Sequence, residues 1–496
     1  MTFRVAEIRD RAVQLKAEVA RERYETRAGL KERPAFRQLY EKHRFLLAPQ
    51  VLPAIQRELA RASGGERRRL MSLYGWVASQ QVEAELAPLE DELRAWEAGT
   101  ILRVGEREIP LRRAPAAMAR SDARALRLEI EAERNRTIEE AAALRLDVLH
   151  REREAVAQLG IGTYVEAHER LTGLNLRGLE RYAVAILART ESPYRAAFLR
   201  HVGQRIGVEA RSAARSDAVW LIGMRWLGQP FAVQPLLARV RSDLERLGLP
   251  LPREGVRIDL DRRPLKEADS FCAALEVPGD VIVVVPPMGG WADARGLLHE
   301  IGHALHFSHT DPDLPFEHRA LGDTSVTESV GLLFESLTLD MEWVESATGL
   351  GGSHLDDYLA LAGFLQLYRA RRDAARFLWE MELAASDRPG ELAPRYAELL
   401  SEATGFEHHP VSFTEEIGRG FWVARRLRAW MLSAIMLDAL QDRFKDGWYR
   451  DPAAGRFLAE ILSAGQRDDA SQLASQLGGG RLGPDSLLER TARWVA

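Results

Sequence analysis

The sequence predicts a mainly α-helical fold with one small β-sheet, and three observations support this class. Residues 1–190 are rich in Ala, Arg, Glu and Leu, and their apolar positions recur at helical spacing. Short β-branched runs are concentrated between residues 256 and 285. After Ala292 the helical pattern returns and continues, for the most part, to the last residue.

The composition is that of a soluble globular protein and excludes several classes of function. The chain has 496 residues, 46% of them hydrophobic and 28% charged, and this length predicts two or three structural units. A net charge of -5 argues against nucleic acid as the main partner, because neutralising phosphates requires a basic excess. Cys272 is the only cysteine, so an intrachain disulfide and a four-cysteine zinc module are both excluded.

The distribution of charges predicts a cytoplasmic protein. Residues 1–25 carry charges every few positions and lack the apolar segment of a signal peptide. No uncharged apolar run reaches about 18 residues, so no membrane span is expected. The single cysteine also suits a reducing compartment.

The segments before the sheet are expected to be helical, with one exception. Apolar residues between positions 121 and 154 recur mainly at threes and fours, which indicates one long amphipathic helix or a pair of helices. Residues 100–111 form a short extended patch around Gly105, which predicts a small hairpin. Helical patterns resume over residues 194–247.

Three short strands are predicted directly before a histidine-rich segment. Residues 256–260 alternate as a strand does, and residues 271–275 and 281–285 follow. These strands place a small sheet next to the helix that begins after Ala292.

The segment 297–309 carries a candidate metal site. His299 and His303 are four residues apart, so on a helix both imidazoles project from one face and can hold a single ion. Zinc suits imidazole nitrogen, and a catalytic zinc site has three protein ligands and an open position for water. Glu300 can then take the proton of a metal-bound water as general base.

Two residues compete for the third ligand position. His309 has the spacing of the metzincin pattern, but that pattern requires a helix-breaking glycine where this chain has His306. Glu328 lies in the first turns of a second predicted helix, which begins near Asp323. We therefore expect a two-histidine, one-glutamate site with Glu328. His306 and His309 are then expected to line the site or to support it from outside.

At this point the sequence resembles the thimet oligopeptidase and oligoendopeptidase F family of zinc peptidases. Residues 299–306 match the family's extended HE-x-GHALH motif, and Glu328 stands 25 positions after His303, as the family's third ligand does. Glu335 matches a second acidic position on the same helix. The resemblance covers residues 255–340, including the strands upstream of the motif.

The resemblance implies an ellipsoidal, two-lobed helical fold with a deep substrate channel. Residues 1–190 would form part of the channel wall, and residues 191–496 would be the catalytic domain. One zinc ion per chain, bound by His299, His303 and Glu328, would hydrolyse bonds in short unfolded peptides. No nucleic acid or membrane partner is implied.

Two further expectations concern the surroundings of the metal. Glu335 and His306 could orient a ligand imidazole through its other ring nitrogen, although Glu335 could instead be an ion-paired helix carboxylate. An extended peptide could pair with the strand Val281–Val285, or that strand could simply belong to the sheet core.

The sequence departs from the family where the oxyanion donor is expected. The family supplies tyrosines from a C-terminal helix, but the matching segment 418–430 contains no tyrosine. Arg425 and Arg428 lie close to the tyrosine positions, and a guanidinium can stabilise an oxyanion. They could instead pair with acidic neighbours. His408 and His409 are further candidates.

Two alternative functions stay open. Thr327-Glu328-Ser329 is similar to the His-Glu-Ser motif of helical metallocarboxypeptidases. The missing tyrosines also fit a zinc-binding homologue with a binding or regulatory role instead of catalysis.

Overall fold

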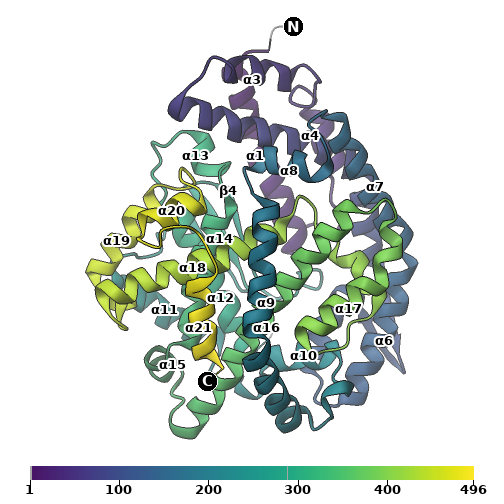
Figure 1. Ribbon diagram of the computed structural model, residues 1–496, viewed down its shortest axis with the longest axis vertical. Coiled ribbons are helices and arrows are strands. Elements are labelled where there is room, and N and C mark those ends of the chain that lie inside the picture. Colours follow the sequence, from purple (N-terminus) through teal and green to yellow (C-terminus); the bar gives the residue numbers. More distant parts are fainter. Residues whose placement is uncertain (1–2, 287–288, 496) are drawn as a thin grey trace.

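The computed structural model describes residues 3–286 and 289–495, and its fold is mainly α-helical, as predicted (Figure 1). Two small sheets interrupt the helices within these residues. Strands β1 (Ile101–Val104) and β2 (Arg107–Pro110) form an antiparallel hairpin, which confirms the expected turn around Gly105. No helix in the described ranges is both long and apolar enough to cross a bilayer.

The N-terminal helices form one end of the molecule (Figure 1). Helices α1 (Val5–Arg27), α3 (Val51–Leu59) and α4 (Gly64–Gly99) bury one hydrophobic cluster together with parts of α7 (Ala142–Gln158) and α8 (Tyr164–Thr172). The predicted helical stretch after residue 121 is a pair of helices, since a single residue, Ala141, separates α6 (Arg124–Glu140) from α7.

A second, larger hydrophobic core begins at Leu174 and includes residues up to Leu487. The expected division after residue 190 falls inside helix α9 (Leu176–His201), which is continuous. The boundary between the two hydrophobic cores therefore lies shortly before α9.

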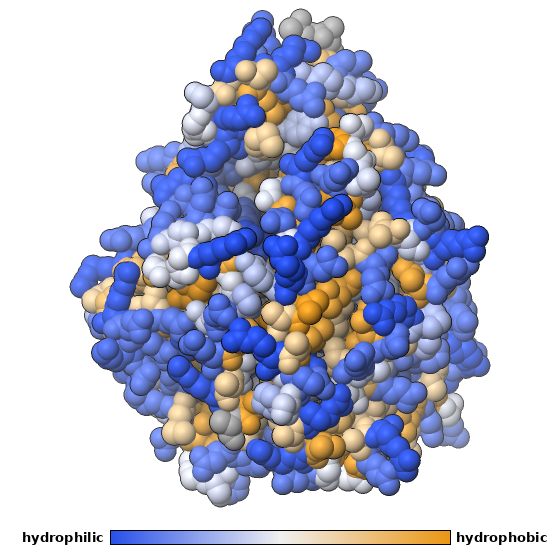
Figure 2. Space-filling view, in the orientation of Figure 1, coloured by the Kyte–Doolittle hydropathy of each residue, from blue (hydrophilic) through white to orange (hydrophobic). Residues whose placement is uncertain are grey.

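The molecular face in Figure 2 is mainly hydrophilic, with hydrophobic residues between the charged ones. Val184 and Leu199 of α9 are about half exposed.

The three-stranded sheet has the order β3-β5-β4. Strand β5 (Asp280–Val284) pairs in parallel with β3 (Val256–Asp259) and antiparallel with β4 (Phe271–Glu276). Successive side chains of a strand face opposite sides. Val281 and Val283 accordingly join the large core, whereas Ile282 and Val284 pack with residues of α1 and β4.

The expectation that a peptide pairs with residues 281–285 is wrong for a topological reason. Both edges of β5 are already hydrogen-bonded within the sheet, so the β-branched run is sheet core. The first two residues of β4, Phe271 and Cys272, line the cavity described below, whereas no residue of β5 does.

The helix after the sheet packs very closely against a second helix. These are α12 (Trp291–His309) and α14 (Thr324–Glu335), flanked by α16 (Gly352–Ala385) and α18 (Trp422–Phe444). A Cβ added to Gly302 of α12 would lie 2.6 Å from the carbonyl oxygen of Val330, and one added to Gly331 would lie 3.0 Å from the His299 ring. Glycine at these two positions lets the two backbones approach.

Gly302→Ala tests this contact. The added methyl group forces the helices apart, and we expect the free energy of unfolding to fall by about 1–3 kcal/mol, the usual cost of overpacking. Denaturant unfolding measures the change. Gly99→Ala is the control, because a Cβ at Gly99 meets no atom within 4 Å and should leave stability unchanged or slightly higher. Equal stabilities for the two variants would contradict the close packing.

Candidate metal centre

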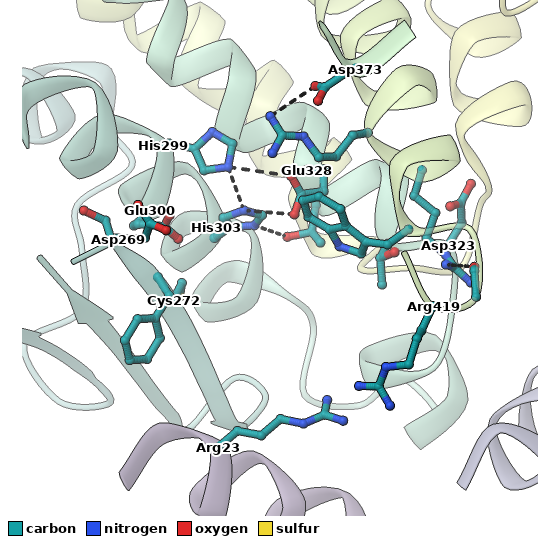
Figure 3. Close-up of a pocket in the computed structure, with 18 of the residues that line it drawn as sticks. Arg23, Asp269, Cys272, His299, Glu300, His303, Asp323, Glu328, Asp373 and Arg419 are labelled. Carbon is teal, nitrogen blue, oxygen red and sulfur yellow. Dashed lines mark hydrogen bonds and ion pairs between the residues drawn. The ribbon is translucent and has the colours of Figure 1, made fainter. Parts of the chain in front are cut away.

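Helices α12 and α14 bring together three side chains that can share one metal ion. His299 and His303 project from α12 and Glu328 from α14, and one ligand atom from each lies within 4.8 Å of the others. The Nε2 atoms of the two histidines are 3.2 Å apart. The Glu328 carboxylate oxygens lie 3.7 Å from Nε2 of His299 and 3.6 Å from Nε2 of His303 (Figure 3).

The other ring nitrogen of each histidine already faces a partner. Nδ1 of His299 lies 3.0 Å from Oε2 of Glu335, and Nδ1 of His303 lies 2.9 Å from Oγ1 of Thr327. If each Nδ1 carries the proton, both Nε2 atoms present lone pairs to the same point in space. Two lone pairs at this separation repel unless a cation lies between them, so the arrangement fits a metal ion.

The distances also fit zinc. Ligand atoms bound tetrahedrally at zinc's usual bond lengths lie about 3.3 Å apart. The three observed separations are close to this value, and two imidazoles with one carboxylate form a usual donor set for zinc. All three residues line the same cavity, which leaves the fourth position open to a water or a substrate.

Charge around the histidines is negative. Burial by itself lowers the pKa of His299, but Glu328 and Glu335 outweigh burial and raise this pKa to about 9. Burial would raise the pKa of Glu328, but the two histidines hold it at about 2. Burial lowers the pKa of His303 to about 4, so this imidazole is neutral, whereas His299 with its raised pKa would release a proton when a metal binds.

Glu335 of α14 is fully buried beside the candidate metal site. Its carboxylate is 3.2 Å from Arg295 Nη1, pairs with Arg369, and accepts a hydrogen bond of 3.1 Å from Gln366. These cations hold its pKa well below the usual range despite burial, so it stays ionised. The geometry is compatible with both expectations for Glu335, since its carboxylate is ion-paired with arginines and also faces His299, a candidate ligand.

The other histidines of α12 lie outside the cluster. His306 is buried, and its Nε2 lies 3.0 Å from the carbonyl oxygen of Gly465, so it links α12 to a distant loop rather than to a ligand. His309 Nδ1 lies 3.0 Å from the carbonyl oxygen of Leu305 in its own helix. Glu328, and not His309, completes the three-residue group.

Glu300 lies next to the histidines on the side of the sheet. Figure 3 places its carboxylate between Asp269 and the histidine pair, above Cys272 of β4. It lines the cavity and has no hydrogen bond or ion pair with another described residue. Burial raises its pKa to about 7, so near neutral pH it can both accept and return a proton.

The cavity in front of the metal site has a volume of about 1470 Å³. Its walls come from α1, α4, α12, α14, α16 and the beginning of α18, as well as from the loop before β4. The metal site therefore lies where N-terminal and C-terminal helices face one another.

The structure separates the two arginines singled out in the C-terminal segment. Arg425 lines the cavity and donates a hydrogen bond of 2.8 Å to the carbonyl oxygen of Gly420. Arg428 is not among the cavity-lining residues, and its guanidinium lies 3.0 Å from Oδ2 of Asp323. For Arg428 the alternative, pairing with an acidic neighbour, is what the structure contains. His408 and His409 do not line the cavity either.

Arg426 is the cationic residue that the sequence reasoning missed. It lines the cavity, its Nη2 lies 3.2 Å from Oδ2 of Asp373, and its charge contributes to the low pKa of Glu328. A dashed line at Asp373 in Figure 3 marks this ion pair. Trp422, one helical turn earlier, packs against the same guanidinium at 5.0 Å. The sequence did contain a signal for this contact, because Trp422 and Arg426 are four residues apart. Using it required knowing that the helix begins at Trp422.

Comparison with known proteins supports the fold. No protein-family model matches the sequence, and no curated protein matches it. Among solved structures, metallocarboxypeptidase 1 of Trypanosoma cruzi aligns over 99% of both chains with a TM-score of 0.61 and 13% identity. An M32 carboxypeptidase from Deinococcus radiodurans R1 aligns over 99% of both chains, with a TM-score of 0.57 and 16% identity.

An oligoendopeptidase F homologue from Bacillus anthracis strain Ames shares the fold as well. The alignment covers 96% of this chain and 84% of that chain, with a TM-score of 0.61 and 12% identity. The expected mainly helical fold of this group is therefore confirmed over nearly the whole chain. At such identities the likeness establishes the fold alone.

Glu335→Gln tests the support of His299. The amide removes the negative charge that faces Nδ1, and we expect the affinity for zinc to fall about 10- to 100-fold. Competition with a chromophoric chelator measures the affinity. Glu317→Gln is a matched control, because Glu317 is also buried and paired with an arginine, Arg9, but does not line the cavity. An equal loss in both variants would contradict a specific role for Glu335.

Proposed function

We propose that this chain is a zinc-dependent oligoendopeptidase that hydrolyses bonds within short unfolded peptides. The observation that carries the proposal is the convergence of His299, His303 and Glu328 at ligand separations beside the unpaired carboxyl of Glu300. The fold shared with peptidases of two kinds supports the same reaction class.

In the proposed mechanism, Glu300 is the general base and acid. A bound zinc ion supplies Lewis acidity, which lowers the pKa of water and polarises a carbonyl group. The Glu300 carboxylate accepts a proton from the attacking water and later delivers it to the leaving amine. Its burial and its pKa of about 7 suit both transfers.

Arg426 replaces Arg425 and Arg428 as our candidate for stabilising the oxyanion. Its guanidinium is held by Asp373 on one side and by the Trp422 ring on the other, so it is oriented before substrate arrives. A preorganised donor of this kind stabilises the charge that develops on the carbonyl oxygen. Arg428 is already occupied by Asp323.

A carboxypeptidase is the second candidate function. The two metallocarboxypeptidase structures are matched over 99% of their own length, whereas the Bacillus anthracis protein is matched over 84%. A carboxypeptidase recognises the free carboxylate at the end of its substrate, and the arginines of the cavity could bind such a group.

Glu300→Gln should keep its zinc and lose turnover. The amide cannot accept a proton. We expect kcat to fall by about 10²- to 10⁴-fold, the usual contribution of a general base. Metal analysis and cleavage of a mixed library of short peptides, with and without chelator, measure both properties. Near-native hydrolysis by the variant would refute the assignment. No chelator-sensitive cleavage by the unaltered protein would favour a binding or regulatory role.

Amidation of the substrate separates the two peptidase types. A library with amidated C-termini removes the charge that a carboxypeptidase requires, whereas an endopeptidase does not depend on it. We expect mass spectrometry to find internal cleavage of both libraries. Release of single C-terminal residues, from the free-acid library only, would support the carboxypeptidase instead.

Arg426→Met tests the oxyanion donor. Removing one such donor usually costs about a hundredfold or more in kcat, with a smaller change in KM. We expect this loss in zinc-saturated Arg426→Met and a much smaller change of kcat in Arg425→Met. A larger loss of kcat in Arg425→Met would return the role to the residue that the sequence suggested.

A further inference from the structure

The cavity is basic although the chain is acidic. Lysines and arginines clearly outnumber aspartates and glutamates among the cavity-lining residues, whereas the whole chain has a net charge of -5. Positive charge is thus concentrated where a substrate would lie. A charged cleft with walls of low dielectric constant focuses its field and attracts ligands of opposite sign.

Several of these cations lack an acidic partner within the described residues. Lys16 of α1 and Arg68 of α4 have neither a hydrogen bond nor an ion pair there. Arg67 and Arg425 donate only to backbone carbonyl oxygens, those of Leu59 and Gly420. Burial and the nearby charge of Arg23 lower the pKa of Lys16 to about 8, which leaves it mostly protonated at neutral pH.

Three acidic residues of the wall are already paired with arginines. Oε2 of Glu83 lies between two arginines, 3.6 Å from Arg23 and 3.4 Å from Arg419. Asp323 and Asp373 are each paired with an arginine of α18, at 3.0 and 3.2 Å. The uncompensated charge of the cavity is therefore positive.

Two of the cations, Arg23 and Arg419, lie away from the candidate metal ligands. Figure 3 shows Arg23 and Arg419 reaching toward one another across the part of the cavity away from the histidine pair. Lys16 is on the same face of α1 as Arg23, seven residues or two turns earlier, and both line the cavity. Charges so placed can contact substrate residues several positions from the bond that is cut.

We propose that the substrates are acidic peptides, whose Asp and Glu side chains bind the basic wall formed by Lys16, Arg23, Arg67, Arg68, Arg419 and Arg425. This inference rests on the proposed peptidase function and specifies its substrate class. Carboxylates form charge-assisted hydrogen bonds with lysine and arginine, and these bonds gain strength in a partly enclosed cavity. A neutral peptide supplies no carboxylate to Lys16 and Arg68, which have no acidic partner among the described residues.

The test compares ten-residue peptides of one sequence frame that are acidic, neutral or basic away from the cleaved bond. With the unaltered zinc protein at about 50 mM salt, we expect kcat/KM to be at least about tenfold higher for the acidic peptide than for the neutral one, and lowest for the basic one. At about 500 mM salt the preference should shrink to less than about threefold, because salt screens the wall.

A charge-reversal pair locates the effect. Lys16→Glu/Arg68→Glu should lose most of the preference for the acidic peptide, measured as the ratio of kcat/KM for the acidic peptide to kcat/KM for the neutral one. The matched control is Arg57→Glu/Arg456→Glu, which changes the net charge equally at exposed positions outside the cavity and should keep the preference. Equal loss of the preference in both double variants would overturn the assignment to the wall.

The outcomes separate this inference from the proposed function. Cleavage of all three peptides at equal rates and at both salt concentrations overturns the inference and leaves the peptidase function intact. If no peptide is cleaved, the peptidase function fails, and fluorescence anisotropy with labelled peptides then measures binding alone. Selective binding of the acidic peptide supports the basic wall. Tighter binding of a short single-stranded oligonucleotide than of the acidic peptide would show that the ligand class is wrong.

Discussion

The contact between α12 and α14 is the constraint on which the candidate metal site depends. Gly302 and Gly331 let the two backbones approach, so that Glu328 on one helix reaches the histidines on the other. A side chain at either glycine would meet the carbonyl oxygen of Val330 or the His299 ring. The site is thus built on two packed helices, and its geometry follows from how closely they pack.

Around this contact, buried charged side chains form chains of ion pairs, in which one residue keeps the next ionised or in position. Arg295 and Arg369 keep Glu335 ionised, and Glu335 in turn faces His299. Asp373 holds Arg426 in the cavity wall, and Arg426 helps to keep Glu328 ionised. Burying one charge alone would be costly, but paired charges at fixed positions can orient ligands and donors in advance.

The position of the sheet explains why substrate recognition is not assigned to its central strand. β5 is paired on both sides, and its β-branched residues alternate between two hydrophobic cores. The cavity is lined instead by the first residues of β4 and by charged side chains of α1, α4 and α18. The charge of the cavity lining is therefore positive, opposite in sign to that of the whole chain.

The sequence by itself determined the mainly helical class, the hairpin around Gly105 and the pairing of His299 with His303. These depend on local periodicity, which a helix or a strand expresses wherever it is placed. The residue pattern and then the family motif pointed to Glu328, and the motif pointed to Glu335, but only the tertiary structure brought Glu328 within reach of the histidines and left His309 outside. The structure alone also decided that β5 is central, that Arg428 is occupied by Asp323, and that Arg426 lines the cavity. Each of these outcomes depends on the start of a helix or on contacts between residues far apart in the chain, and a pattern of neighbouring residues does not encode such contacts.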